Sequence, residues 1–203
     1  MTMAQDNSEG LMGPVSAEAR AAMKGQRPFV LWLTGLSGAG KSTLAEAIDQ
    51  RLHGRGLHSY VLDGDIMRHG LNRDLGFSAD DRRENIRRTG EVSRLLVDAG
   101  LIVVSAFISP YRADRELLRQ LFPAGQYIEI YVEAPLAVCE QRDPTGLYKR
   151  ARAGEIRDFT GIGSPYESPL QPDISLRTDL MSPVQCVEEV FAVLQRRGCL
   201  QRG

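Results

Sequence analysis

Short runs of apolar residues recur along the chain, and longer segments with helical spacing separate them. The apolar runs occupy residues 29–33, 60–62, 101–104 and 127–132, with a weaker copy at 173–176. Each run is apolar on both faces, which is typical of strands buried in a parallel sheet. Helical spacing covers residues 41–55, 80–99, 112–121, 136–142 and 184–197. The alternation predicts an α/β fold in three layers, with a mostly parallel central sheet flanked by helices.

Residues 1–27 differ from the rest, because they are rich in Ala, Gly, Gln, Asn and Ser and contain few large apolar side chains. We expect a flexible amino-terminal extension with a helical turn or two around residues 15–23, followed by one domain over residues 28–203. Within that domain, residues 146–163 combine four glycines with several basic side chains. A loop of this kind is typical of a lid or binding segment, and disorder is the alternative.

The charge balance is nearly neutral, with 25 Lys and Arg against 26 Asp and Glu. This balance argues against nucleic acid or an anionic membrane as a partner. The three cysteines are widely spaced, which fits neither a disulfide framework nor a metal knuckle. No apolar run approaches the roughly 18 residues of a membrane helix. We therefore expect a soluble cytoplasmic protein that binds any anion through a local site.

The segment after the first apolar run carries a phosphate-binding motif, G-x-x-x-x-G-K-S. The predicted ATP-binding residues are Gly35, Leu36, Ser37, Gly38, Ala39, Gly40, Lys41, Ser42 and Thr43. Glycines let successive backbone N–H groups point inward, Lys41 reaches the β- and γ-phosphates, and the Ser42 hydroxyl is a ligand for Mg²⁺. The motif predicts a P-loop nucleotide-binding protein, but it does not separate kinases from GTPases or ATPases.

Two carboxylates, Asp63 and Asp65, follow the second apolar run. At the carboxyl end of a strand beside a P-loop, such groups accept a proton from an acceptor hydroxyl or hold Mg²⁺. The alternative is an Asp-Gly turn that caps the next helix.

Basic side chains gather farther along, in the predicted helix 80–99. Arg82 and Asn85 share a helix face, which favours Arg82 as an anion ligand. Three further arginines, Arg83, Arg87 and Arg88, fit a solvated surface equally well. The three histidines lack metal-ligand spacing, and we assign them no catalytic role.

These motifs form part of a longer pattern that resembles the adenylylsulfate (APS) kinase family. The pattern includes GLSGAGKST at residues 35–43, LDGD at 62–65, LGFS at 75–78, FISPY at 107–111 and GLYK at 146–149. The resemblance runs from about residue 31 to the carboxyl terminus. It implies a P-loop kinase fold and transfer of the γ-phosphoryl group of MgATP to the 3′-hydroxyl of adenosine 5′-phosphosulfate (APS). The products would be 3′-phosphoadenosine 5′-phosphosulfate (PAPS) and ADP.

Carried over by position, the resemblance also implies an acceptor site. Its residues are Asp65, Arg68, Phe77, Arg82, Asn85, Ile108, Ser109, Lys149 and Phe159. The two Phe rings would stack on the adenine, and Arg68, Arg82 and Asn85 would hold the phosphosulfate. The catalytic groups would be Lys41, Asp63, Asp65 and Ser109, with Ser42 and Asp63 on the metal. A homodimer and a functional link to ATP sulfurylase are implied in the same way.

Three positions qualify the resemblance. Ile66 stands where the family commonly has Asn, and Thr145 stands where it usually has Lys, so Lys149 or Arg150 would have to supply the missing charge. Ser109 is often described in the family as a phosphorylated intermediate, but its neighbours in sequence include no base to activate it. We favour direct in-line transfer with Ser109 as a substrate contact, and keep the intermediate as the alternative.

Two other functions remain open from the sequence. One is a P-loop kinase for gluconate, shikimate or a nucleoside monophosphate, and paired Phe77 and Phe159 favour a flat purine over the first two. The other is a nucleotide-binding regulatory module of a sulfurylase complex, without turnover. Intact Lys41, Asp63 and Asp65 favour an enzyme.

Overall fold

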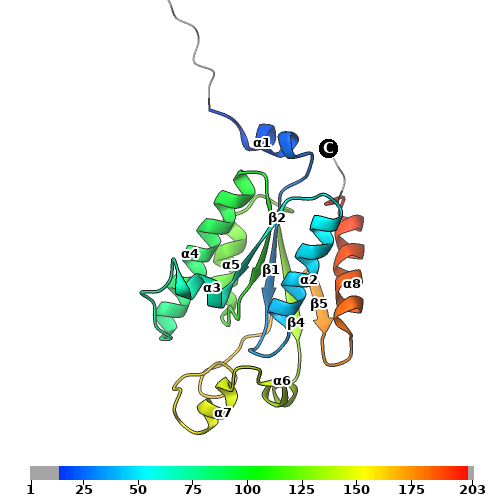
Figure 1. Cartoon of the computed structure of the whole chain (residues 1–203). Helices are drawn as coiled ribbons and strands as arrows, with labels where there is room; N and C mark the ends of the chain where they lie inside the picture. The colour runs from blue at the N-terminus through cyan, green and yellow to red at the C-terminus, as the bar shows by residue number, and fades with distance from the viewer. Residues whose placement is uncertain (1–13, 201–203) are drawn as a thin grey trace, which may run out of the picture.

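A sheet of five parallel strands lies between two layers of helices in the computed structural model, which describes residues 14–200 (Figure 1). The strands are β1 (Val30–Thr34), β2 (Ser59–Asp63), β3 (Ile102–Ala106), β4 (Tyr127–Glu133) and β5 (Ile174–Arg177). Their order across the sheet is β2-β3-β1-β4-β5. Each strand coincides with a predicted apolar run, and the predicted fold class is confirmed.

The helices divide between the two faces of the sheet. They are α1 (Ala17–Lys24), α2 (Lys41–Gly54), α3 (Gly64–His69), α4 (Ala79–Asp98), α5 (Arg112–Gln120), α6 (Leu136–Arg142), α7 (Leu147–Arg152) and α8 (Pro183–Arg196). Helices α2 and α8 pack together on one face, and α4 and α5 pack on the other (Figure 1).

Strand β1 shows why the apolar runs are continuous. Leu31 and Leu33 join the apolar cluster that includes α2 and α8, whereas Val30 and Trp32 join the cluster that includes α4 and α5. All four side chains are fully buried. Because successive side chains of a strand point to opposite faces, a strand covered on both sides must be apolar at every position.

Two short helices, α3 and α7, were absent from the predicted helical ranges, although the sequence offered the turn at Asp63 as the cap of a helix. We expected residues 146–163 to be a loop, but Leu147–Arg152 form α7. The Asp143 carboxylate accepts hydrogen bonds from the backbone N–H groups of Tyr148 and Lys149, at 3.0 and 3.1 Å. This side chain satisfies N–H groups that a helix leaves free in its first turn. A local cap therefore sets α7, not a long apolar repeat.

The residues before β1 are fastened to the domain. Helix α1 agrees with the helical turns expected near residues 15–23, and Ser16 caps its start. The Gln26 side chain, which is buried, donates to the carbonyls of His58 and Gly100 at 2.9 Å each and accepts from the His58 N–H. The ordered domain therefore reaches back beyond residue 28. Residues 1–13 of the expected extension lie outside the described residues.

The candidate site lies at the carboxyl ends of three adjacent strands, β2, β3 and β1. Asp63 of β2 lies level with Ala106 of β3, and Ala106 lies level with Leu33 of β1. The segments that follow these strands are the phosphate loop, α3 and residues 107–111, which consequently meet at one edge of the sheet.

None of the helices between residues 14 and 200 has the length and apolar character needed to cross a membrane.

Candidate active site

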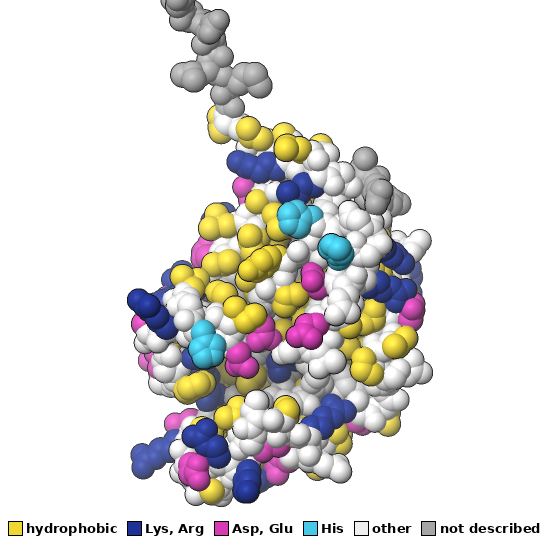
Figure 2. Space-filling model, in the orientation of Figure 1, with side chains coloured by type: hydrophobic (Ala, Val, Ile, Leu, Met, Phe, Trp, Pro, Cys, Tyr) yellow, Lys and Arg dark blue, Asp and Glu magenta, His cyan; other side chains and the backbone are white. Residues whose placement is uncertain are grey.

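A cavity of about 1120 Å³ opens at this edge of the sheet. Its walls come from the phosphate loop, α3, α4, residues 106–110 and the segment 144–160. Figure 2 shows it as a hollow between the small lobe around α7 and the body of the molecule. The volume slightly exceeds the roughly 300–1,000 Å³ of single small-molecule sites, so the cavity has room for more than one ligand.

The phosphate loop follows β1 and ends at the first turn of α2. Gly35 and Gly38 have positive φ angles, 156° and 72°, and a Cβ atom there would lie 2.3 Å from the Val132 carbonyl oxygen and 2.9 Å from that of Cys139. Only glycine fits against these carbonyls. The first residues of α2, Lys41 to Thr43, line the cavity, so the amino terminus of this helix faces it, as an anion site requires.

Lys41 is the first residue of α2 and only 9% exposed. Its Nζ donates a hydrogen bond to the Leu36 carbonyl at 2.7 Å, across the phosphate loop. Burial lowers the pKa of Lys41 to about 8, although the negative charges of Asp63 and Asp65 act in the opposite direction. Within the described residues the Lys41 ammonium group forms no ion pair, so it is available to bind phosphate.

Side chains from distant parts of the chain bind the outer carbonyls of the phosphate loop. The Tyr148 hydroxyl donates to the Ser37 carbonyl at 3.0 Å, and Thr178 Oγ1 donates to that of Ala39 at 2.8 Å. Arg142 Nη1 donates to the carbonyls of Gly38 and Ala39 at 3.3 and 3.5 Å. Donors on the carbonyl side hold the loop in the conformation that leaves its N–H groups for a ligand. Sequence reasoning missed all three supporting side chains.

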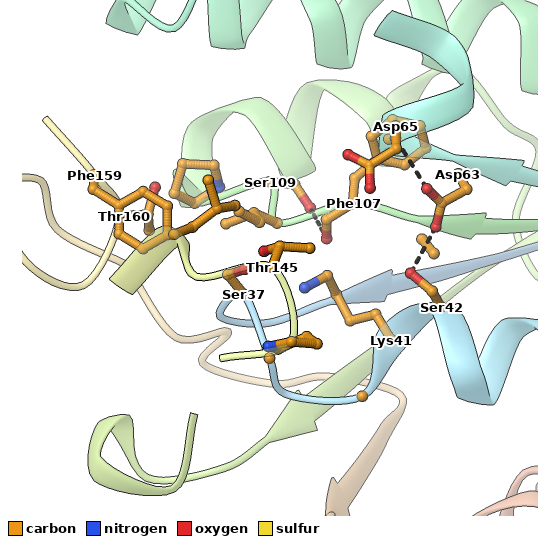
Figure 3. A pocket seen from close by; sticks show the side chains of 18 of the residues that line it. Ser37, Lys41, Ser42, Asp63, Asp65, Phe107, Ser109, Thr145, Phe159 and Thr160 are labelled. Carbon is orange, nitrogen blue, oxygen red and sulfur yellow. Dashed lines mark hydrogen bonds between the residues drawn. The ribbon is translucent and has the colours of Figure 1, made fainter. Parts of the chain in front are cut away.

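Asp63 connects the phosphate loop to α3. Its Oδ2 accepts a hydrogen bond from the Ser42 hydroxyl at 2.7 Å, and its Oδ1 accepts from the Asp65 N–H at 2.9 Å as the cap of α3 (Figure 3). The capping and functional interpretations of Asp63 are therefore compatible. Asp65 is exposed and lines the cavity.

These oxygens suit a magnesium ion. Mg²⁺ prefers oxygen ligands and binds through one or two protein groups together with water and substrate phosphates. The Ser42 hydroxyl and the Asp63 carboxylate offer that donor set at the mouth of the phosphate loop. No cluster of three or more His, Cys, Asp or Glu side chains that could hold a metal occurs within residues 14–200.

Aromatic and basic groups line the opposite side of the cavity. Phe77 is 63% exposed, and the Arg68 guanidinium lies 4.3 Å from the centre of its ring. Phe159 is 8% exposed and packs edge-on against Tyr148, with ring centres 5.0 Å apart. The pKa of Arg68 is lowered, first by burial and then by the charge of neighbouring Arg82. Like charges held this close favour an anionic ligand.

Arg82 binds protein groups in this state. Its guanidinium donates to Thr160 Oγ1 at 2.5 Å, to the Asp158 carbonyl, and through Nε to the Phe77 carbonyl at 3.0 Å. It thereby joins α4 to the lid segment. Asn85 is buried, and its Oδ1 accepts a hydrogen bond from Asn72 Nδ2 at 2.9 Å.

Comparison with known proteins decides the family. The model for adenylylsulphate kinase matches residues 27–177. The adenylyl-sulfate kinase of Marinobacter nauticus is 60% identical over 92% of this chain and 94% of its own, and the probable adenylyl-sulfate kinase of Bacillus subtilis is 55% identical over the same shares. The chain belongs to the adenylyl-sulfate kinase family.

The fold comparison agrees. The structure is similar to that of the Mycobacterium tuberculosis APS kinase CysC in complex with AMPPNP and APS, with a TM-score of 0.80 and 46% identity. The match covers 84% of this chain and 99% of that one.

Most residues expected from the resemblance to adenylyl-sulfate kinases meet at one cavity. Those that line it are Ser37, Gly38, Gly40, Lys41, Ser42, Thr43, Asp63, Asp65, Arg68, Phe77, Arg82, Asn85, Ile108, Ser109 and Phe159. Leu36 instead lines a second, smaller pocket, and Gly35 and Ala39 belong to the phosphate loop but line neither pocket.

Lys149 is the exception on the acceptor side. Its side chain is exposed and lies outside the cavity lining, whereas Arg150 and Arg157 of the lid line it. Arg150 pairs with Glu155 at 3.1 Å. Thr145 also lines the cavity, at the position where the sequence resemblance led us to expect Lys. Arg150 and Arg157 are better placed than Lys149 to supply that charge.

The remaining arginines of α4 behave as a charged surface. Arg87 pairs with Glu84 at 2.7 Å, and Arg88 pairs with Asp74 at 2.7 Å. Arg83 pairs with Asp80 at 3.0 Å.

Cys139 is fully buried, and burial raises the pKa of its thiol, which is typical of a cysteine in the core.

Proposed function

We propose that this protein transfers the γ-phosphoryl group of MgATP to the 3′-hydroxyl of APS, giving PAPS and ADP. The observation that carries the proposal is the shared cavity: the phosphate loop and the aromatic and basic acceptor groups line the same space. Family membership supports the same reaction. Two nucleotides bound from opposite sides would bring the γ-phosphate and the acceptor hydroxyl together between them.

On the donor side, Lys41 and the loop N–H groups bind the phosphates. Lys41 becomes fully charged when phosphate replaces the Leu36 carbonyl as its partner, and it then stabilises the charge that develops during transfer. Ser42 and Asp63 would hold Mg²⁺, which neutralises phosphate charge when bound. Phosphoryl transfer depends mainly on positioning of the reactants and on stabilisation of negative charge, and these donor-site residues would provide both.

On the acceptor side, the two carboxylates have different roles. Asp63 is already engaged with Ser42 and with the start of α3. The Asp65 carboxylate makes no hydrogen bond to another side chain within the described residues and lines the cavity, so we assign it the proton of the 3′-hydroxyl. A carboxylate at this position can accept the proton that the 3′-hydroxyl loses as its oxygen attacks the γ-phosphorus.

The acceptor itself is held by rings and cations. Phe77 and Phe159 would stack on the adenine, at about 1–3 kcal/mol for each base–aromatic contact. Arg68 lies over one face of Phe77, and we expect it to leave that face for the phosphosulfate. Arg82, Asn85, Ile108 and Ser109 complete the pocket for the anion.

Residues 146–163 act as the lid in this proposal. They include α7 and the Asp158–Thr160 stretch that Arg82 binds. A kinase must exclude water from the γ-phosphate, and a segment that contacts both nucleotide sites can close over them. Tyr148 connects the two sites, because its hydroxyl binds the phosphate loop and its ring packs on Phe159.

One assay tests the function. ADP release from MgATP is measured with APS, AMP, gluconate or shikimate as acceptor. We expect saturable turnover with APS and little with the others. Turnover with one of the other acceptors and none with APS would contradict the proposal. ATP binding without turnover on any acceptor would favour a regulatory module.

The direct-transfer mechanism has its own test. ATP made chiral at the γ-phosphorus should yield PAPS with inverted configuration, because a single in-line displacement inverts the centre. Retention would instead require two displacements and would support a phosphorylated Ser109.

The proposal includes an assembly and a setting. We propose a homodimer, for which exposed Tyr60, Ile66 and Leu95 offer apolar surface on β2, α3 and α4, and Figure 2 shows apolar side chains gathered on this face. Sedimentation velocity measures the mass, and a monomer at micromolar concentration would contradict the proposed dimer.

We also propose a functional link to ATP sulfurylase in the cytoplasm, because APS is formed by adenylylation of sulfate. Three free buried cysteines fit a reducing compartment.

A further inference from the structure

The Trp32 side chain belongs to both the core and the active site. Its ring is fully buried in β1 and stacks on Phe107 and Tyr127, with ring centres 5.4 and 6.4 Å away. A buried indole N–H needs a hydrogen-bond acceptor. Here Nε1 donates to Ser109 Oγ at 3.0 Å, and Ser109 lines the cavity. A side chain of the core is therefore hydrogen-bonded to a hydroxyl group of the candidate active site.

Ser109 is held in an uncommon conformation. Its φ angle is 40°, in the left-handed region, and it is 1% exposed. Arg115, itself buried and paired with Glu129 at 2.8 Å, donates to the Ser109 carbonyl at 2.6 Å. Thr34 Oγ1 donates to the neighbouring Ile108 carbonyl at 2.7 Å. Such a conformation persists only when its surroundings fix it, and it is frequent at functional sites.

The hydrogen-bonding capacity of the Ser109 hydroxyl shows what this arrangement achieves. A serine hydroxyl donates one hydrogen bond and accepts two. Trp32 uses one acceptor position, and the acceptor within the described residues for the serine's own hydrogen is the Phe107 carbonyl, at a long 3.4 Å (Figure 3). That hydrogen is easily redirected to a better acceptor. Donation from the indole also polarises the O–H bond and strengthens it as a donor.

We propose that Trp32 is a positioning residue for the acceptor, and that its indole N–H orients the Ser109 hydroxyl to donate to an anionic oxygen of the bound acceptor. The inference rests on the proposed function, because that function supplies an anionic acceptor at Ser109. It concerns only the orientation of the hydroxyl group. Trp32 lies behind Ser109 in the core and touches no substrate.

A double-mutant cycle tests the link. Trp32→Phe keeps an aromatic ring in the core, removes the N–H donor and also reduces the size of the side chain. Loss of the donor should raise KM for APS about fivefold, the equivalent of one neutral hydrogen bond, with KM for ATP unchanged. Ser109→Ala should raise KM for APS at least as much. The double variant should resemble Ser109→Ala to within about twofold, because both changes remove the same interaction.

Tyr127→Phe is the matched control. Tyr127 stacks on the same indole, and its hydroxyl is buried without a hydrogen-bond partner within the described residues. Its removal perturbs the same cluster but leaves the Trp32–Ser109 contact intact, so both KM values should stay at wild type. If Trp32→Phe raised both KM values equally, or its effect multiplied with that of Ser109→Ala, Trp32 would have only a packing role.

Fluorescence gives a second readout, because Trp32 is the only tryptophan of the chain. In the presence of MgADP, which prevents turnover, APS should produce a saturable change in tryptophan emission, whereas MgADP alone should not. Ser109→Ala, at APS concentrations that calorimetry shows to be saturating, should lose most of that change. An equal change in Ser109→Ala would overturn the inference.

The two proposals fail in different ways. If APS neither binds nor turns over in the wild-type protein, the proposed function is wrong. If the wild-type protein turns over APS and Trp32→Phe has wild-type kinetics, the function stands and the positioning role of Trp32 is refuted.

Discussion

The charge state of Lys41 gives the sharpest prediction, because the structure holds this ammonium group away from water. Burial lowers its pKa from 10.5 to about 8, even though two carboxylates act in the opposite direction. A bound nucleotide brings phosphate charge to Nζ and should raise the pKa again, towards its ordinary value of 10.5. Binding of MgADP must therefore draw protons from the buffer, and the amount depends on pH.

The magnitude follows from the two pKa values. With a pKa of about 8, the free site lacks about 0.1 proton at pH 7, about 0.5 at pH 8 and about 0.9 at pH 9. These are the numbers of protons that each bound MgADP should take up. Lowering the pKa of Lys41 from 10.5 to about 8 corresponds to roughly 3 kcal/mol of lost stability in the ligand-free protein.

Calorimetry measures the uptake directly. Binding enthalpies of MgADP are compared in two buffers of different ionisation enthalpy at each pH, and the slope gives the number of protons. A slope near zero at pH 8 and 9 would refute the argument, since it would mean that Lys41 is already charged in the free site. In activity assays, KM for ATP should rise as the pH increases through 8.

Folding stability supplies an independent check with a definite sign. The folded pKa lies below the unfolded value, so the unfolded state binds more protons between pH 8 and 10.5, and stability rises with pH across that window. Below pH 8 the full penalty is present. Lys41→Met removes it but loses the bond to Leu36, so at pH 7 unfolding free energy should increase by about 2 kcal/mol while transfer is abolished. Urea unfolding measures the gain, which should largely disappear near pH 10.5.

Three further predictions concern the acceptor side and the lid. Tyr148→Phe keeps the ring against Phe159 but loses the hydrogen bond to Ser37, so KM for ATP should rise about fivefold in steady-state assays; an unchanged KM would show that the hydroxyl does not support the loop. Phe77→Ala should raise KM for APS by roughly tenfold through lost stacking and leave KM for ATP unchanged; equal losses would contradict the placement of the adenine. Amide exchange in residues 146–163 should slow when ADP and APS are added together, and unchanged exchange would remove the lid from the mechanism.

The sequence predicted the elements that long apolar patterns determine. Strand β1 is apolar at every position because both of its faces are covered, and this pattern is visible without a structure. The ranges of α3 and α7 were not predicted, because each helix has only 6 residues and no apolar repeat. The sequence did offer Asp63 as a helix cap, but it gave no such signal for Asp143, which lies four residues before α7 and binds its N–H groups.

The candidate site divides in a similar way. The conformation of a contiguous motif such as residues 35–42 can be predicted from the sequence, because it consists of one turn followed by the start of one helix. Arg82 shows the limit of this reasoning. Its helix position predicts an anion ligand, and Arg82 does line the cavity. The spacing did not show that its guanidinium also binds Thr160 and the Asp158 carbonyl, more than seventy residues away in sequence. Helical spacing places a side chain on a face and gives no information on what faces it.

Sheet order explains why the support of the phosphate loop was not visible. Strand β4 pairs directly with β1, with Tyr131 level with Thr34, so whatever follows β4 at the carboxyl edge must lie beside the loop that follows β1. That segment contains Arg142 and Tyr148, which bind the carbonyls of Gly38 and Ser37. The order of strands cannot be read from apolar runs alone. Once it is known, the contact between α7 and the phosphate loop follows from topology.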